Sequence, residues 1–328
     1  MDIYDNLLEA VHNEYDTIRL IKKSERGEVS LVRHRDSGTR YIFRHFYGSS
    51  EVYQLLLTIS CPYLPQIMEV GERDGRTVLL EEYVQGDTLR DILECGLLTA
   101  AEARQITRQL CSALWVLHSM GVVHRDVKPQ NIFVDEFGNF KLGDFGISRT
   151  IEKTMSGLSR KGTESYMAPE VYNGNAYGES VDVYSLGLVL YKCLNNNRLP
   201  FFPPISKPIR YSDREEALNK RMAGYRIPEL ENVTDEFMEI LYKACEFNPQ
   251  KRIKNAEELY ESLDLLEKKR RQESGTKNYY GKRDAEKTEL IENGKMYHTG
   301  RNSGSRTYTS EKKQGKNRKT AGVIGAFA

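Results

Sequence analysis

Charged and amide side chains gather in two short stretches near the middle of the chain, VVHRDVKPQNIFV (122–134) and KLGDFGIS (141–148). The residues in them that could take part in chemistry are Asp126, Lys128, Asn131 and Asp144. Asn131 and Asp144 offer the amide and carboxylate oxygens that Mg²⁺ prefers as ligands. A metal held beside Lys128 would suit the transfer of a phosphoryl group, which depends on positioning and on neutralising spread negative charge.

A third stretch, GTESYMAPE (162–170), follows these two in the chain. The order H-R-D-x-x-x-x-N, D-F-G and A-P-E resembles the motif set of the protein kinase family. Each triplet alone would be weak, but the ordered set makes chance agreement negligible. The resemblance covers residues 15–267 and implies the bilobal α+β protein kinase fold, with a small β-rich lobe over about 15–85 and a larger helical lobe over about 86–267.

The resemblance implies a role for each residue of this catalytic set. Asp126 is similar to the aspartate that accepts the proton of the substrate hydroxyl, and Lys128 is similar to the cation near the transferred group. Asn131 and Asp144 are similar to the residues that hold Mg²⁺ against the phosphates of ATP, so ATP and Mg²⁺ are the implied cofactors. The D-F-G is completed by Phe145 and Gly146.

Two positions resemble serine/threonine kinases rather than tyrosine kinases. Lys128 stands two residues after Asp126 in VKPQN, and Thr163 stands where serine/threonine kinases keep a threonine that faces the catalytic loop. The implied substrates are therefore Ser and Thr hydroxyls of proteins.

The resemblance also marks residues 144–170 as an activation segment. Arg125 is placed as in kinases that dock a phosphorylated activation segment on this arginine. We therefore expect autophosphorylation of this segment. The candidate sites are Thr150, Thr154, Ser156 and Ser159. Each of them has the simpler alternative of being a solvated hydroxyl.

Two further matches are structural. Asp182, in SVDVYSLG, resembles the buried aspartate of a central helix that braces the catalytic loop. Arg252, in NPQKR, resembles the arginine that pairs with the A-P-E glutamate, which is Glu170 here. A buried pair of this kind is better evidence for a unique fold than for net stability.

The N-terminal half departs from the family pattern. SGTRYIFR (37–44) aligns without a gap with the family's T-G-x-x-Y-A-I-K and puts Arg44 where the family has the lysine that grips the phosphates. Arginine keeps the charge, but its planar fork is bulkier and pairs differently. Two alternatives stay open: Arg44 contacts nucleotide phosphates, or it is a solvated strand residue beside an impaired site.

The rest of the implied nucleotide site is altered too. In the template G-x-G-x-x-G-x-V only the third glycine survives, as Gly27, and Lys22 and Ser24 take the other two places. Lys22 or Lys23 could supply a substitute charge. LLEEYV resembles the hinge of the family and puts Glu81 at the gatekeeper position, which is usually apolar or Thr. The residues implied to contact the nucleotide are Gly27, Val29, Ile42, Arg44, Glu82, Val84 and Phe133.

The helix expected within SSEVYQLLLTI (49–59) begins soon after Arg44 and must be short. Val52 stands where the family has a glutamate, and Glu51 lies beside it. Glu51 either pairs with Arg44 or complements the helix dipole from the first turn.

The elements that must position these residues follow from periodicity. Runs rich in Val, Ile, Tyr and Phe predict strands within 15–47 and two more strands within 65–84, around an Asp-Gly turn. Helical spacing predicts helices over 100–121, 180–194, 234–246 and 255–269. The helix over 180–194 is apolar nearly all round, so it should be buried.

Charge is distributed unevenly along the chain. Residues 267–328 hold 16 Lys/Arg and 7 Asp/Glu, which leaves 32 and 40 of the chain's 48 and 47 for the residues before them. The acidic body argues against nucleic acid as a partner, whereas the basic tail suits an anionic membrane surface or another protein. Because helical periodicity fades after residue 267, we predict a basic, disordered tail over 268–328.

Five scattered cysteines predict a reducing compartment. We find no signal peptide and no apolar run of about 18 residues. We expect a cytoplasmic protein, with peripheral membrane association through the basic tail as the alternative. The final AGVIGAFA is either a plain terminus, which we favour, or the start of a membrane segment outside this chain.

Three functions are consistent with these features. The first is an ATP- and Mg²⁺-dependent serine/threonine protein kinase, similar in character to the eukaryotic-like kinases of bacteria. The second is a pseudokinase that serves as a nucleotide-binding scaffold, an alternative kept open by Arg44 and Lys22. The third is a small-molecule phosphotransferase. The segment with Thr163 and A-P-E argues against the third, because these elements shape a peptide groove in the family.

Overall fold

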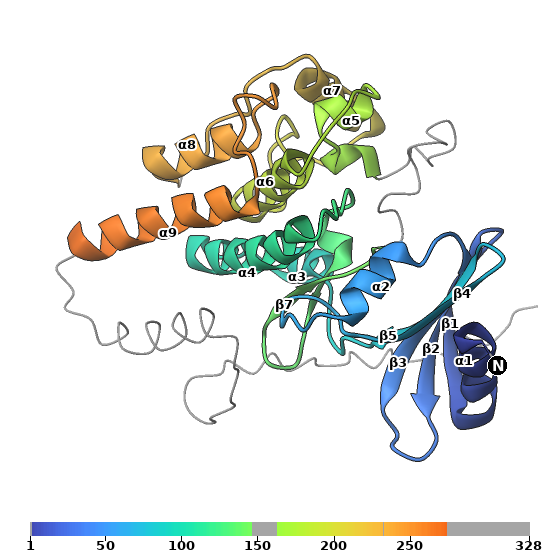
Figure 1. Cartoon of the computed structure of the whole chain (residues 1–328). Helices are drawn as coiled ribbons and strands as arrows, with labels where there is room; N and C mark the ends of the chain where they lie inside the picture. The colour runs from blue at the N-terminus through green and yellow to red at the C-terminus, as the bar shows by residue number, and fades with distance from the viewer. Residues whose placement is uncertain (1, 146–162, 232, 274–328) are drawn as a thin grey trace, which may run out of the picture. The chain divides into compact units, whose positions relative to one another are not determined.

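The computed structural model describes residues 2–145, 163–231 and 233–273, which lie in one compact unit, Met1–Ser274. The N-terminal part is a five-stranded antiparallel sheet with strand order β1-β2-β3-β5-β4 (Figure 1). Its strands are β1 (Tyr15–Ser24), β2 (Gly27–His34), β3 (Arg40–Tyr47), β4 (Ile67–Arg73) and β5 (Arg76–Glu82). The strands predicted within 15–47 and 65–84 are confirmed. Asp74 and Gly75, both with positive φ, form the tight turn between β4 and β5.

The two faces of this sheet have different partners because side chains alternate along each strand. Phe43 and Val78 belong to a small core that faces one side. Arg44 and Leu79, their neighbours in sequence, face the other side, where Leu79 joins the large core of the helical lobe. The face of the sheet that is turned toward the helical lobe therefore carries the second set of side chains.

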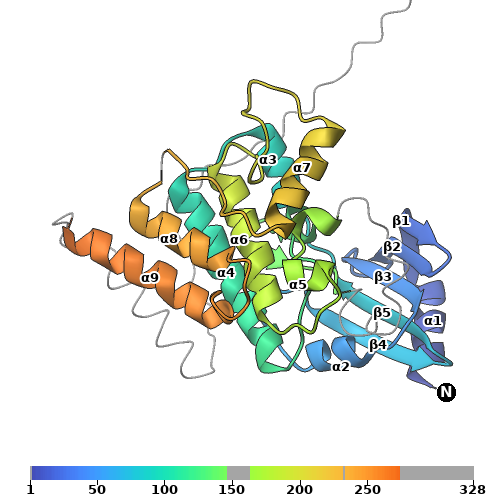
Figure 2. The ribbon, with the colours of Figure 1, turned by 90° about the horizontal axis from the view of Figure 1, so that it is seen from above.

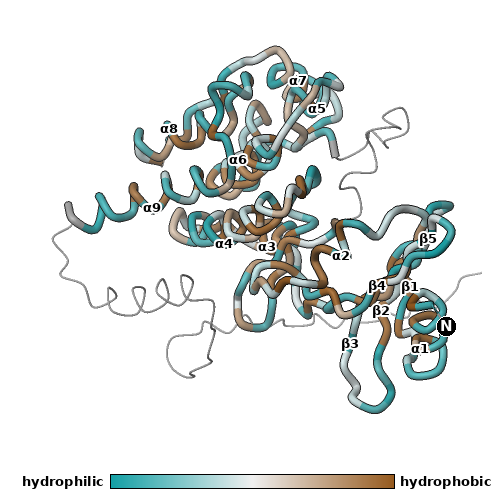
Figure 3. Tube along the Cα trace, in the orientation of Figure 1, coloured by the Kyte–Doolittle hydropathy of each residue, from teal (hydrophilic) through white to brown (hydrophobic). Residues whose placement is uncertain are grey.

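An N-terminal helix that the sequence analysis did not predict covers the first face. This helix, α1 (Ile3–Glu14), lies against the strands in Figure 1 and buries Tyr4 and Leu7 in the small core. Gly71 in β4 permits the close approach, because a Cβ atom there would lie 2.6 Å from the Tyr4 nitrogen. In Figure 3 the strands show brown apolar stretches, and α1 beside them carries both brown apolar and teal polar residues.

The helical lobe is built around α6 (Ser180–Leu194), which is buried along nearly its whole length, as predicted. Figure 2 shows α4 (Ala100–Ser119) between α6 and α9 (Ala256–Glu273). The other helices are α2 (Glu51–Leu57), α3 (Leu89–Cys95), α5 (Pro169–Tyr172), α7 (Tyr211–Met222) and α8 (Asp235–Ala244). Thr99 begins α4 with a capping box that it forms with Glu102, which satisfies free backbone donors at the helix start.

The predicted bilobal α+β fold is confirmed. Helix α9 continues through 268–273, residues that the sequence analysis had assigned to the tail. The tail from residue 274 onward lies outside the described residues. Among the residues that the structure describes, no helix is long and apolar enough to cross a membrane.

Candidate active site

The loop between α4 and a short hairpin brings three predicted catalytic residues together. The hairpin strands are β6 (Ile132–Val134) and β7 (Phe140–Leu142), and the loop ends in a 3-10 turn, η1 (Pro129–Asn131). Asp126 Oδ2 accepts hydrogen bonds from Lys128 Nζ at 2.6 Å and from Asn131 Nδ2 at 2.9 Å. The Asn131 amide nitrogen also donates to the Asp126 carbonyl. These bonds fix the Asp126 carboxylate and turn the Asn131 amide oxygen away from it.

The loop is braced by Asp182, which lies in the first turn of α6 and is fully buried. Its carboxylate accepts the backbone N–H groups of His124 at 2.8 Å and Arg125 at 2.7 Å, and His118 Nε2 lies at 3.0 Å. Arg125 has φ of 67°. This region costs a non-glycine residue energy and persists only where the surrounding structure imposes it. The Asp182 bonds supply that constraint at the residue directly before Asp126.

The D-F-G places Asp144 opposite this loop. Phe145 is 2% exposed, and its ring makes edge contacts with Tyr53 of α2 at 6.4 Å and with His124 at 5.5 Å. Asp144 also has a positive φ, 66°. Phe145 is thus anchored between two elements, and the neighbouring Asp144 carboxylate accepts a hydrogen bond from Arg44 Nη1 at 3.1 Å.

Arg44 of β3 is the residue on which the site departs from its family. Its Nε donates to Glu81 Oε1 at 2.8 Å, and its Nη1 donates to Asp144 Oδ1 at 3.1 Å. The Arg44 side chain is 17% exposed, and Glu81 is 4% exposed. Arg44 is thus no solvated strand residue, so that part of the second alternative is wrong. Its carboxylate partners include Glu81 and Asp144, and Glu51 lies in the first turn of α2.

The electrostatics of this cluster keep Asp144 ionised. Burial raises the pKa of Asp144, but the nearby cations outweigh burial, so that the pKa lies below its ordinary value. The groups that lower the pKa of Asp144 are, in order of effect, Arg44, His124, Lys22 and Lys128. Lys22 is therefore close enough to act on the site. For Glu81, burial raises the pKa, and Arg44 offsets part of that rise.

The partnership of Arg44 with Glu81 was missed in the sequence analysis, which noted Glu81 only as an unusual gatekeeper. The sheet register explains the contact: Ile42 lies opposite Glu81, and Arg44 lies opposite Leu79. Arg44 and Glu81 are therefore diagonal neighbours on one face of adjacent strands, within reach of long side chains. A register prediction for 40–47 and 76–82 would have found the pair.

The Tyr53 hydroxyl is a second feature that the sequence did not reveal. It is buried and has no hydrogen-bond partner among the described residues. Burial raises the pKa of Tyr53, while the charge of Arg44 acts in the opposite direction. An orphaned donor beside Arg44 is a place where a phosphate oxygen or a water molecule would satisfy a polar group.

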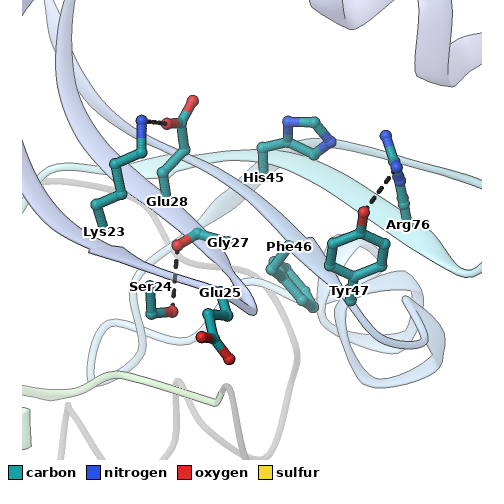
Figure 4. A pocket seen from close by; sticks show the side chains of 9 residues that line it. All are labelled: Lys23, Ser24, Glu25, Gly27, Glu28, His45, Phe46, Tyr47 and Arg76. Atoms are coloured by element: carbon teal, nitrogen blue, oxygen red, sulfur yellow. Dashed lines mark hydrogen bonds and ion pairs between the residues drawn. The ribbon is translucent and has the colours of Figure 1, made fainter.

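The degenerate glycine loop is a tight hairpin, in which Ser24 pairs with Gly27. Gly27 has φ of 147°, and a Cβ atom there would lie 2.3 Å from the His45 carbonyl oxygen. The surviving glycine is thus required by the approach of β2 to β3, whatever it does for a nucleotide. A cavity of about 250 Å³ lies beside this hairpin. Gly27 and Lys23 are among the residues that line it (Figure 4), whereas Arg44 and Asp144 are not.

The residues implied to hold adenine come from both lobes. Val29 and Ile42 are partly buried on β2 and β3, and Val84 is buried in the segment after β5. The Phe133 ring touches Gly143, where a Cβ atom would lie 3.1 Å from it. Glu82 binds Lys141 Nζ with both carboxylate oxygens at 2.8 Å, so its side chain is already engaged.

The A-P-E glutamate forms a buried ion pair with Arg252, as predicted. Arg252 donates two bonds to Glu170, at 2.6 and 2.9 Å, and the two side chains are 0% and 6% exposed. Thr163 begins the 3-10 turn η4 (Thr163–Tyr166). The Arg125 guanidinium lies over the Tyr177 ring, 4.9 Å from its centre.

Breaking this pair should test the fold rather than the chemistry. We expect Glu170→Gln to lower the free energy of unfolding by about 3–5 kcal/mol, because it leaves the Arg252 cation buried without its counterion. Urea denaturation would measure the loss. The double variant Glu170→Gln/Arg252→Met should recover a large part of it. A loss below about 1 kcal/mol in the single variant would contradict the role of the pair.

Five of the predicted positions lie outside the described residues: Gly146, Thr150, Thr154, Ser156 and Ser159. The expectations for the phosphorylation sites therefore stay predictions.

The fold and the arrangement of this site are those of a protein kinase. The family model for the protein kinase domain matches residues 15–263, so the chain belongs to the protein kinase family. Its relatives include the serine/threonine-protein kinase cds1 of Schizosaccharomyces pombe, 29% identical over 79% of this chain and 60% of that protein. A probable serine/threonine-protein kinase of Clostridium perfringens is 32% identical over 73% of this chain and 34% of that protein.

A third relative, the serine/threonine-protein kinase DCLK3 of Mus musculus, is 30% identical over 74% of this chain and 32% of that protein. The chain therefore spans between about a third and three fifths of the length of these relatives. The relatives support the resemblance to serine/threonine kinases, including a bacterial one.

Proposed function

We propose that this chain is a serine/threonine protein kinase that transfers the γ-phosphoryl group of ATP to Ser and Thr hydroxyls of proteins. One observation supports the proposal: Asn131 binds Asp126 through its side chain, and the Gly143 N–H, next to Asp144, donates to the Asn131 carbonyl at 2.9 Å, so the two separate stretches lie together. The similarity to serine/threonine kinases supports the substrate class.

In this mechanism the substrate hydroxyl oxygen forms a bond to the γ-phosphorus while the bond from that phosphorus to the β,γ-bridging oxygen breaks, and ADP leaves. The hydroxyl proton passes to Asp126, whose carboxylate is oriented by Lys128 and Asn131. Lys128 Nζ, 2.6 Å from Asp126, also places a positive charge beside the reacting groups. Each step therefore uses a side chain that the structure holds in a single arrangement.

The residues present fit Mg²⁺. The amide oxygen of Asn131 and the second carboxylate oxygen of Asp144 have no hydrogen-bond donor among the described residues, and both are hard oxygen ligands. Bound there, Mg²⁺ would neutralise charge on the phosphate groups. The lowered pKa of Asp144 keeps this carboxylate in the form that binds a cation.

Arg44 stands where the family has a lysine, and its guanidinium stays positively charged. Its Nη1 contacts Asp144, which puts the guanidinium at the edge of the implied metal and phosphate site. Guanidinium groups bind phosphate oxygens in a forked geometry. We propose that Arg44 contacts the nucleotide phosphates while Glu81 holds its Nε.

We also propose that the kinase phosphorylates its own activation segment. Arg125, which directly precedes Asp126, is the residue on which the phosphorylated segment would dock. The candidate acceptors remain Thr150, Thr154, Ser156 and Ser159.

The second candidate is a pseudokinase that binds nucleotide without transfer. The ion pair of Arg44 with Asp144 favours it, because a cation already occupies one oxygen of the carboxylate that Mg²⁺ would need. The two candidates differ in whether nucleotide and metal displace this pair.

The test is incubation of the whole chain with γ-labelled ATP, Mg²⁺ and a protein substrate rich in Ser and Thr, beside Asp126→Asn. Label on Ser or Thr in the wild type alone supports the kinase. A rise in the melting temperature with Mg-ATP, without any label, would support the scaffold instead. Phosphoamino-acid analysis would also locate autophosphorylation.

A further inference from the structure

A groove in the helical lobe adjoins the catalytic loop and is large enough for a peptide segment. Its volume is about 670 Å³. Pro129 and Gln130 of η1 form one wall, between Lys128 and Asn131 of the catalytic set. Ser165 and Tyr166 of η4 line it as well. The groove therefore borders the loop that carries Lys128 and Asn131.

The groove is rich in positive charge. Its charged lining residues are Arg90, Glu94, Lys192, Arg198 and Arg214. Arg90 and Glu94 pair with each other on α3 at 3.2 Å, so their charges offset one another. The other three charged lining residues are cations: Lys192 of α6, Arg198 of the segment after it and Arg214 of α7.

These three cations have no carboxylate within ion-pair distance among the described residues. Lys192 Nζ donates to the Asn197 carbonyl at 3.1 Å, and Arg198 donates to the carbonyls of Ile205 and Lys207. Carbonyl oxygens orient the cations but carry no net charge. The uncompensated charge of the groove is therefore positive, and it attracts an anionic partner.

Apolar side chains provide the rest of the lining. They are Leu93, Leu97, Leu199, Phe202, Ile205 and Ile209. Leu97 is 63% exposed and Ile205 is 59% exposed, so apolar surface is open to solvent beside the cations. A partner with both acidic and apolar side chains fits this mixture better than a purely charged one.

We propose that this groove selects protein substrates in which an acidic segment, with an apolar residue among the acidic ones, lies next to the phosphorylated Ser or Thr. The inference rests on the proposed kinase function. The proposed occupant is a separate protein substrate, because the chain's own tail is basic overall, with 16 Lys/Arg and 7 Asp/Glu over residues 267–328.

Lys192 gives the selection a pH dependence. Burial lowers the pKa of Lys192 to about 8. The charged and titratable groups that act on it are Cys193, Arg198, Arg214 and Glu94. A bound carboxylate favours the charged form of Lys192, so acidic peptides should bind more weakly as the pH rises from about 7 to 9.

Cys95 offers a direct measure of occupancy, because it lines the groove and is exposed, whereas Cys111, Cys193 and Cys245 are buried. The probes are two peptides of equal length with one Ser and one Leu, the first rich in Glu and the second rich in Lys. The whole chain is alkylated with N-ethylmaleimide without nucleotide or metal, and mass spectrometry follows Cys95. We expect the Glu-rich peptide alone to slow the reaction.

The matched variants are Arg214→Glu in the groove and Lys269→Glu on α9, where the lysine is an exposed cation outside the groove. Arg214→Glu should weaken protection by the Glu-rich peptide about fivefold and raise its KM by a similar factor, because an attraction becomes a repulsion. The kcat should change by less than about twofold. Lys269→Glu should change neither quantity.

The readouts keep the two proposals apart. Protection requires no catalysis, so a chain that fails to transfer phosphate can still show Glu-selective protection, and only the kinase proposal then fails. Equal protection by both peptides, protection by the Lys-rich peptide alone, or a Cys95 that no peptide protects would overturn the groove proposal. A preference for Lys-rich substrates in an active kinase would overturn it as well.

Discussion

Asp144→Asn should lower phosphoryl transfer by at least about 10²–10³-fold, the scale of losing one preorganised electrostatic contact in an active site. The substitution removes the negative charge that would hold Mg²⁺ but keeps the shape of the side chain. It also removes one partner of Arg44, whose Nη1 lies 3.1 Å from Asp144 Oδ1. Initial rates with saturating ATP and a protein substrate would measure the effect.

The fold of this variant should stay intact. Phe145 anchors the D-F-G through its ring contacts, and those contacts do not depend on the Asp144 charge. Arg44 keeps its bond with Glu81. A variant that still transfers phosphate at close to the wild-type rate would mean that Asp144 holds no metal. A variant that unfolds would leave Asp126→Asn as the matched test, because Asp126 has no contact with Arg44.

The helical half of the molecule was predictable because its signals are local. The helix at 180–194 has the predicted bounds, since apolar residues lie on nearly all of its sides. The motif spacing around Asp126 and Asn131 also depends on one loop only. The bonds from Asp182 to the loop join residues far apart in sequence, and only the family resemblance made them visible from the sequence.

The N-terminal half was less predictable because its contacts are not local. Helix α1 was not predicted. Its apolar residues, such as Tyr4 and Leu7, are buried by packing on the sheet, and this contact is not visible in the local sequence. The partner of Arg44 depends on strand register, which places Glu81 diagonally across from it. Spacing along the chain offered Glu51 as one of two alternatives, because a glutamate close to the family position is a local cue.

The resulting arrangement differs from the family's in where the glutamate comes from. In the family pattern the cation of the sheet is paired with a helix residue, so its position depends on that helix. Here Arg44 and Glu81 lie on adjacent hydrogen-bonded strands of one sheet. The hydrogen bond that positions Arg44 is therefore made to Glu81 within the same sheet, and we expect this bond to form without Glu51. We expect Glu51→Ala to leave nucleotide affinity unchanged within about twofold, as measured by equilibrium binding.

Glu81→Leu should be far more damaging than any change at Glu51. It leaves the guanidinium of Arg44, 17% exposed, with Asp144 as its remaining carboxylate partner. We expect a loss of about 3 kcal/mol in the free energy of unfolding, the lower end of the range for a broken buried pair, because Asp144 still compensates part of the charge. Denaturant titration would measure it.

The double variant Arg44→Met/Glu81→Leu separates stability from nucleotide binding. Replacing a buried ion pair by apolar side chains of similar size is often neutral, so the stability should return to within about 1 kcal/mol of the wild type. Nucleotide affinity should not return, because no cation remains at this point of the site. We expect it to be at least tenfold weaker than in the wild type, or about 1.4 kcal/mol, by equilibrium binding.

Arg44→Lys with Glu81 retained is the sharper comparison, because it keeps the charge and changes its geometry. A lysine ammonium is a compact charge without the fork that lets Arg44 reach Glu81 and Asp144 at once. If Arg44 contacts phosphate, this exchange must alter nucleotide affinity measurably. Equal affinities in Arg44→Lys, in the double variant and in the wild type would show that Arg44 only fills the cleft, and the scaffold alternative would then gain its strongest support.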